Sequence, residues 1–209
     1  TADRQDKDLI RQIRQSGVTE ISLSPDAKEV AFIVRGDIFV TSVEYKTTKQ
    51  ITNTPQQERS VSFSPDGRSL VYCAERGGVW QIYQTKLKNK NEKLFTYATE
   101  LEEERLTNSN ETSLQPQYSP DGKEVAYFKN RAELCVINLK TRQERTVLDG
   151  KYNFSYRDGD LWFEWSPDSK WLLASYIGTG GWNSIDIALV NASGNGEVYN
   201  LTESGYDTT

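Results

Sequence analysis

The chain has 209 residues, a formal net charge of −5 and no histidine. The negative charge argues against nucleic acid as the main partner, because phosphate contacts need clustered lysine and arginine. The lack of histidine excludes a Ser-His-Asp triad, a Cys-His dyad and a histidine-based zinc site within these residues. No apolar run is long enough to span a membrane as a helix, so we expect no membrane insertion.

Residues 1–17 carry Leu9, Ile10 and Ile13 among charged side chains. This pattern fits either a short amphipathic helix or the end of a repeat unit that precedes residue 18. The spacing supports the second interpretation, because Ile51 and Leu106 stand at the ends of later repeats and Ile13 has nearly the same place before the next repeat.

One nine-residue motif occurs four times and is the main signal in the sequence. Apolar residues alternate on both sides of a Pro-Asp pair, which predicts two half-buried strands joined by a tight turn. Gly67 and Gly122 suit a left-handed residue in this turn, where Ala27 and Ser169 would cost about 1–2 kcal/mol. We therefore expect a different geometry in those two turns. The copies are SPDAKEVAF from Ser24, SPDGRSLVY from Ser64, SPDGKEVAY from Ser119 and SPDSKWLLA from Ser166.

Each copy is followed by two more strand-like segments, so the sequence predicts an all-β fold, a β-propeller of four-stranded antiparallel blades. A β-sandwich with similar hairpins is the less favoured alternative. About four blades are expected, as part of a larger six- or seven-blade ring. Residues 88–104, an insertion in the second repeat, are charged and predict an exposed loop or short helix. The approximate blades are 18–54, 59–109, 114–149 and 161–203.

The residues offer no clear catalytic or metal-binding set. Cys73 and Cys135 lie in different repeats and are expected to be free, buried thiols. The glycine-rich stretch 178–181 lacks the Lys and Ser/Thr of a phosphate loop, and Asp158 and Asp160 lack further calcium ligands. A carboxylate pair for glycoside hydrolysis stays open among the 30 acidic residues, although nothing singles one out. We expect no catalytic residue, no metal and no cofactor in this segment.

Residues 151–165 are rich in aromatic side chains. Trp162 or Phe163, together with Trp165, is expected to pack between blades. Tyr152 and Tyr156 lie in a connection between blades, and Trp182 lies beside a glycine-rich turn. Because tyrosine and tryptophan are enriched at interaction sites, these three residues are candidates for contact with a peptide or partner.

The motifs FSPDGRSLVY and YSPDGKEVAY, with the strand ends ITNT and RLTNS, resemble the repeats of TolB, prolyl-oligopeptidase relatives and tricorn peptidases. The ordered run over residues 16–206, which includes RGDIFVTS and the insertion after the second blade, resembles more specifically the second propeller of tricorn-like serine peptidases of bacteria such as Bacteroidetes.

This resemblance implies a non-catalytic propeller that guides or filters peptides toward an active site in a separate C-terminal domain. The parent would be a serine-type peptidase, a hydrolase, whose catalytic residues match no position here. Its partners would be peptides or unfolded polypeptide and the PDZ-like and catalytic domains of the same chain. A homo-oligomer stays open. The resemblance also implies a periplasmic or cell-envelope location. The alternative is a stand-alone TolB-like propeller that serves as an interaction scaffold in the envelope.

Overall fold

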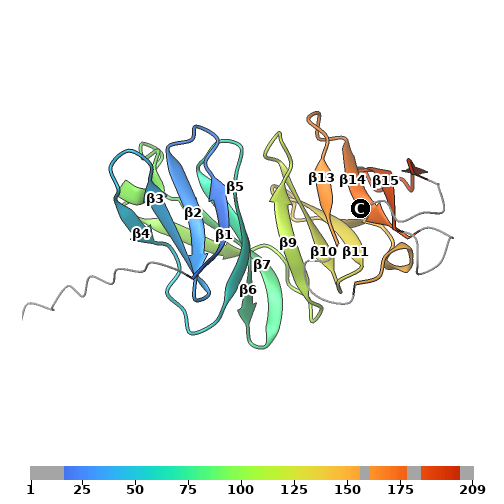
Figure 1. The fold of residues 1–209 in the computed structure, drawn as a ribbon, viewed down its shortest axis with the longest axis horizontal. Helices are drawn as coiled ribbons and strands as arrows, with labels where there is room; N and C mark the ends of the chain where they lie inside the picture. Colours follow the sequence, from blue (N-terminus) through green and yellow to red (C-terminus); the bar gives the residue numbers. More distant parts are fainter. Residues whose placement is uncertain (1–16, 156–160, 178–184, 203–209) are drawn as a thin grey trace, which may run out of the picture.

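The computed structural model describes residues 17–155, 161–177 and 185–202. These residues form four antiparallel sheets of four strands, and in each sheet the strands follow one another in chain order (Figure 1). This arrangement confirms the expected all-β propeller, of which the chain forms a part. Blade 1 contains β1 (Val18–Leu23), β2 (Glu29–Val34), β3 (Asp37–Ser42) and β4 (Thr48–Gln50); blade 2 contains β5 (Glu58–Phe63), β6 (Ser69–Arg76), β7 (Val79–Leu87) and β8 (Leu101–Arg105). Blade 3 contains β9 (Ser113–Tyr118), β10 (Glu124–Lys129), β11 (Glu133–Asn138) and β12 (Glu144–Leu148); blade 4 contains β13 (Phe163–Trp165), β14 (Trp171–Tyr176), β15 (Asp186–Asn191) and β16 (Val198–Asn200).

Successive blades pack face to face, and the period-two alternation of each strand supplies two apolar faces. Along β6, Leu70 and Tyr72 belong to the core shared with blade 1, whereas Val71 and Cys73 belong to the core shared with blade 3. A third core joins blades 3 and 4. The four blades are therefore held together by three apolar cores, one at each junction.

The two outward faces of the set are also apolar. On blade 1, Ile21 is 73% exposed and stands beside Phe32 in the strand register, and Phe32 stacks on Phe39. On blade 4, Trp171 and Tyr199 contact each other with ring centres 5.9 Å apart. These faces correspond to those that are buried at the three junctions, as expected for part of a propeller.

The repeated motif forms the same turn in all four blades. The serine hydroxyl donates to the aspartate carboxylate two residues on and accepts the backbone N–H five residues on, for example from Glu29 to Ser24. The expected different geometry at Ala27 and Ser169 is wrong. Their φ angles are 57° and 60°, against 69° and 71° at Gly67 and Gly122. The side-chain hydrogen bonds hold the turn, so two blades tolerate a left-handed residue without glycine.

A second repeated hydrogen-bond pattern fixes the end of the last strand in three of the blades. Thr52, Thr107 and Thr202 each follow the last strand and accept the backbone N–H of an isoleucine in the third strand, at 2.8–2.9 Å. The three hydroxyls in turn donate to an acidic or amide side chain, namely Glu58, Gln81 and Asp186 respectively.

The insertion of blade 2 contains the expected short helix, but its centre is buried rather than exposed. Residues 95–97 form a short 3-10 helix, η1 (Phe95–Tyr97), and the Phe95 side chain is fully buried in the core between blades 1 and 2. The carboxylate of Glu29 in β2 is itself buried and accepts the backbone N–H groups of Phe95 and Thr96. The charged ends of the insertion are exposed, but its centre is anchored to blade 1.

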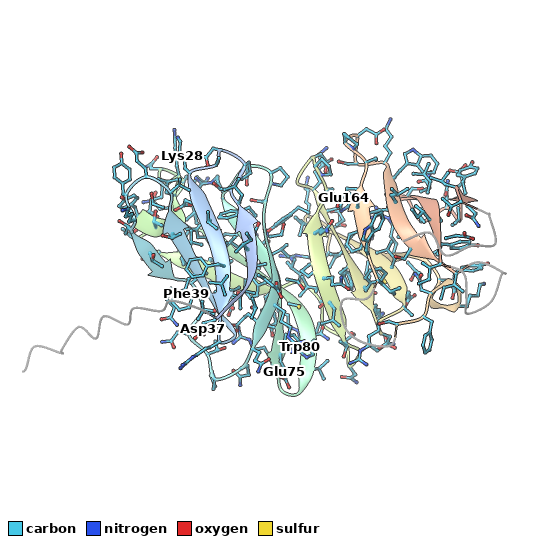
Figure 2. All side chains as sticks on the ribbon, in the orientation of Figure 1. Lys28, Asp37, Phe39, Glu75, Trp80 and Glu164 are labelled. Carbon is cyan, nitrogen blue, oxygen red and sulfur yellow. The ribbon has the colours of Figure 1, made fainter. Side chains whose placement is uncertain are left out.

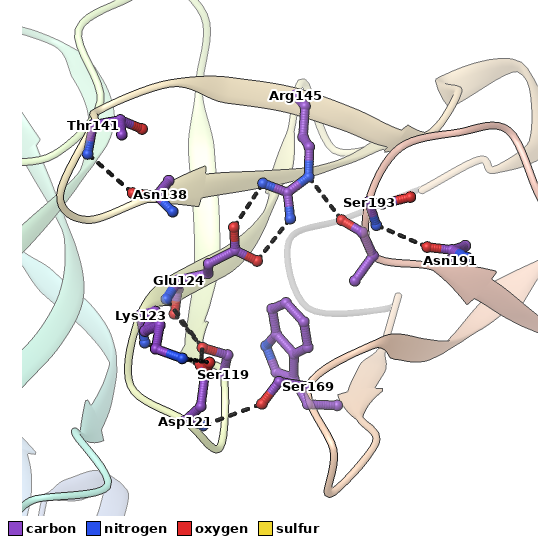
Figure 3. A network of polar contacts seen from close by, with 12 residues as sticks. Ser119, Asp121, Lys123, Glu124, Asn138, Thr141, Arg145, Ser169, Asn191 and Ser193 are labelled. Atoms are coloured by element: carbon purple, nitrogen blue, oxygen red, sulfur yellow. Dashed lines mark hydrogen bonds and ion pairs between the residues drawn. The ribbon is translucent and has the colours of Figure 1, made fainter.

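A polar network also connects blades 3 and 4 (Figure 3). The Arg145 guanidinium donates two hydrogen bonds of 2.7 Å to the two carboxylate oxygens of Glu124, and its Nε donates to the backbone oxygen of Ala192. The Ser169 hydroxyl accepts the backbone N–H of Asp121. Bidentate arginine–carboxylate geometry is specific as well as strong, so this network fixes how blade 4 lies against blade 3.

Candidate functional site

The first strand of each blade is a sheet edge. In every sheet that strand pairs with one neighbour only, so β1, β5, β9 and β13 each have an unpaired side. The edges of successive blades lie close together, since β1 contacts β5 and β5 contacts β9 (Figure 1). A sheet edge offers backbone groups as well as side chains, although on β5 the backbone N–H groups of Ser60 and Phe63 are already bonded to the side chains of Glu20 and Ser22.

Two hollows follow these edges and share the lining residues Ser60 and Gln115. Their volumes are about 560 and 540 Å³. We call the two together the inner groove. Its first hollow is lined mainly by β1, β5, β9 and the turn at Arg35 and Gly36. Its second hollow is lined by β1, β5, β9 and Glu164 of β13.

Four polar residues that line the second hollow come from equivalent positions, one in each blade. Each of these residues stands two positions before the serine of the repeated motif, so the repeat places all four at the same level. They are Ser22, Ser62, Gln117 and Glu164. The four residues meet at one hollow because successive blades place their first strands side by side.

Besides Arg35 and Gly36 in their hairpin turn, two lining residues within strands are in the left-handed region. Ser60 has φ 57° and Gln115 has φ 55°, and each lies where the pairing of its strand with the next one shifts register. A bulge re-aims the neighbouring side chains, and non-glycine residues in this region are frequent at functional sites. The Glu20 carboxylate accepts the backbone N–H of Ser60, and the Gln115 amide donates to the backbone oxygen of Leu161 at 3.0 Å. The first bond links β1 to β5, and the second links β9 to the segment just before β13.

The first hollow contains four charged side chains. The Arg59 guanidinium lies 4.7 Å from the centre of the Trp80 ring. Glu58 is buried, accepts the hydroxyls of Thr52 and Thr54 and pairs with Arg76 at 3.2 Å. Burial raises the pKa of the Glu58 carboxyl above its ordinary value, against the lowering effect of its hydroxyl partners and Arg76. The other two charges, Glu20 and Arg35, are at the wall nearest blade 1.

The Cys73 thiol borders the same hollow but is not a nucleophile. Cys73 is fully buried, and its Sγ donates to the backbone oxygen of Arg59 at 3.3 Å. Burial raises the pKa of the thiol to about 12, so almost none is ionised near neutral pH. Cys73 and Cys135 are both free and buried, as the sequence indicates.

The residues singled out from the sequence do not line the inner groove where the structure describes them. Tyr152, in the short helix η2 (Gly150–Tyr152), packs against the core of blades 3 and 4 with its ring 5.4 Å from that of Tyr176. Tyr156 and Trp182 lie outside the described residues. Phe163 and Trp165 are buried in that core, whereas Trp162 is 47% exposed. The missed signal is the polar residue two positions before each motif serine.

Among the described residues, no group of three or more histidine, cysteine, aspartate or glutamate side chains is arranged to hold a metal ion. No helix in the described ranges is long and apolar enough to cross a membrane. The groove thus presents sheet edges, hydroxyls, amides and a few charges, a set suited to binding an extended chain.

The sequence matches no protein-family model and no curated protein. Solved structures similar to this chain include a structure described as TolB of Agrobacterium tumefaciens (20% identity, TM-score 0.66) and TolB of Acinetobacter baumannii (21% identity, TM-score 0.61). A third is an oligogalacturonate lyase in complex with manganese (17% identity, TM-score 0.58). The matches cover 91%, 88% and 78% of this chain but only 63%, 43% and 45% of those chains, which is less than two thirds of each. At this identity the likeness shows the fold alone: the described residues form blades of a β-propeller similar to that of the TolB structures.

Proposed function

We propose that this chain is a non-catalytic propeller scaffold that binds extended polypeptide along its inner groove. The observation that carries the proposal is the convergence of four equivalent polar residues, one from each blade, on a hollow bordered by sheet edges. An extended peptide can add its backbone hydrogen bonds to such an edge while side-chain pockets select its sequence.

The proposal has a narrower form and an alternative. In the narrower form, favoured by the sequence resemblance, the propeller guides or filters peptides toward a separate catalytic domain of a tricorn-like serine peptidase in the periplasm or cell envelope. In the alternative, a stand-alone TolB-like propeller serves as a protein-interaction scaffold in the envelope. The intact mass of the protein from its native source separates the two. A mass several times that of 209 residues supports the peptidase form, and a mass near that of this chain supports the scaffold.

Binding itself is tested by fluorescence anisotropy with fluorescein-labelled casein as an unfolded polypeptide. The variant Ser62→Trp places a large side chain in the second hollow, and we expect it to weaken binding about tenfold or more, since a filled groove excludes the chain. The matched control Ser193→Trp adds the same side chain at an exposed position outside the inner groove. Absence of saturable binding, or equal affinity of Ser62→Trp and the unchanged protein, would overturn the proposal.

A further inference from the structure

Building on the polypeptide-binding role proposed above, we propose that the inner groove selects extended peptides with an acidic and a basic side chain four residues apart. The acidic side chain is held at the Arg35 end of the groove, and the basic side chain at the Glu164 end.

The positive end is the wall of the first hollow. Arg35 is exposed, lines the hollow, and has no hydrogen-bond or ion-pair partner among the described residues. Arg59 adds a second positive charge over the Trp80 ring. Glu58 pairs with Arg76, which also pairs with Glu103 at 3.0 Å, and Glu20 accepts the backbone N–H of Ser60. None of these contacts engages the Arg35 guanidinium, which can bind a carboxylate of a ligand in bidentate geometry.

The negative end is the second hollow. Glu164 is its one charged lining residue within the described part of the chain, and its carboxylate has no hydrogen-bond or ion-pair partner there. Figure 2 shows Glu164 near the upper end of the blades, whereas Asp37, two residues after Arg35, lies at the lower end. A lysine or arginine side chain of a ligand fits this end by charge.

The distance between the two ends follows from strand register. The turn that carries Arg35 is hydrogen-bonded to the start of β5, because the backbone N–H of Glu58 donates to the oxygen of Gly36 at 2.8 Å. Glu164 occupies the same level as Ser62, since both stand two positions before the motif serine. Glu58 and Ser62 are four residues apart in β5, but the bulge at Ser60 sets them opposite Ala74 and Val71 of β6, which are three residues, or about 10 Å, apart along a strand. Side chains four residues apart lie on the same face of an extended peptide, about 13 Å apart, and the flexible stem of lysine or arginine covers the remaining ~3 Å.

The test uses fluorescein-labelled nonapeptides with blocked termini in a serine–threonine–valine background. One peptide carries glutamate followed by lysine four residues later, a second has the reverse order, and a third has glutamine at both places. We expect at least one charged peptide to bind about fivefold tighter than the glutamine peptide at low salt, and this advantage to shrink in 0.5 M salt as ions screen the pairs (about 3–10 Å screening length).

Variants locate the effect. In Arg35→Gln, the glutamate of the peptide should no longer increase the affinity; in Glu164→Gln, the lysine should no longer do so. Combining each protein variant with each peptide gives a double-mutant cycle for each charge pair. Arg131→Gln is the matched control for arginine, because Arg131 also has a positive φ in a hairpin turn but does not line the groove. Glu102→Gln on β8 is the control for glutamate. Both controls should keep the full preference.

The outcomes separate the two proposals. If the glutamine peptide binds as tightly as both charged peptides, the groove binds polypeptide and the charge selection is wrong. If Arg35→Gln and Glu164→Gln still bind the charged peptides more tightly than the glutamine peptide, Arg35 and Glu164 do not select the charges and the inference is wrong. If neither casein nor any peptide binds, the polypeptide-binding role itself fails.

Discussion

The buried carboxylate of Glu29 accepts two hydrogen bonds from Thr96, one from its backbone N–H at 2.8 Å and one from its hydroxyl at 2.7 Å. A third comes from the backbone N–H of Phe95 at 3.0 Å. One side chain of blade 1 thereby satisfies the polar groups of an insertion that belongs to blade 2.

Replacement of Glu29 tests the importance of this anchor. Glu29→Ala leaves two buried N–H groups without their acceptor, and we expect the free energy of unfolding in urea to fall by about 3 kcal/mol. Thr96→Val removes one hydroxyl bond and should cost about 1 kcal/mol. Glu102→Ala, at an exposed position, serves as the control and should change stability by less than about 0.5 kcal/mol. A loss of similar size in Glu29→Ala and Glu102→Ala would contradict the anchoring role.

The left-handed residue of the repeated turn gives a second prediction. Gly67→Ala should lower the free energy of unfolding by about 1 kcal/mol through backbone strain at the positive φ. A steric clash adds nothing, because the added Cβ would lie at an ordinary contact distance of 3.6 Å from Pro25. Ala27→Gly should stabilise by about 0.5 kcal/mol, the strain relieved less the entropy cost of glycine.

Ser169→Gly provides the comparison. It relieves the same backbone strain but removes the hydroxyl that accepts the backbone N–H of Asp121 at 3.1 Å. We therefore expect the free energy of unfolding to stay nearly the same. Thermal unfolding of the three variants measures the order of their stabilities. If Ala27→Gly destabilises the protein as much as Gly67→Ala does, strain is not the governing effect.

The Ser24 hydroxyl should control the ionisation of Asp26. Its hydrogen bond, and next the backbone N–H of Lys28, lower the pKa of the Asp26 carboxyl below its ordinary value of 3.8. The stabilisation from this group is therefore complete above the unfolded-state pKa and is lost as the pH falls through the lower, folded-state pKa. Ser24→Ala should raise the pKa toward 3.8, as measured by NMR titration of the carboxyl carbon. An unchanged pKa in Ser24→Ala, with Ser193→Ala as control, would argue against this hydrogen bond.

The two thiols should be inert in the folded protein. Burial raises the pKa of both Cys73 and Cys135 to about 12, so alkylation by iodoacetamide at pH 8 should be negligible. Addition of urea should bring both residues into reaction at the rate of unfolding. Mass spectrometry after timed quenching measures this, and rapid labelling of Cys73 without denaturant would show that the groove opens to the reagent.

Local pattern was sufficient to predict the class of fold. Alternation around four Pro-Asp turns identifies paired strands without any knowledge of the tertiary structure, because strand periodicity and turn chemistry act over a few neighbouring residues. The same strand periodicity predicts that Cys73 and Cys135 are buried, and both are buried in the structure.

The tertiary structure alone decided what each repeated position does. Glu29 and Thr96 lie 67 residues apart and meet only because blade 1 packs against blade 2, so the charged sequence of the insertion does not reveal that its centre is buried. The inner groove likewise exists only once Ser22, Ser62, Gln117 and Glu164 are brought to one level by the stacking of blades. Contacts between distant segments carry no local signal, and these contacts form the site.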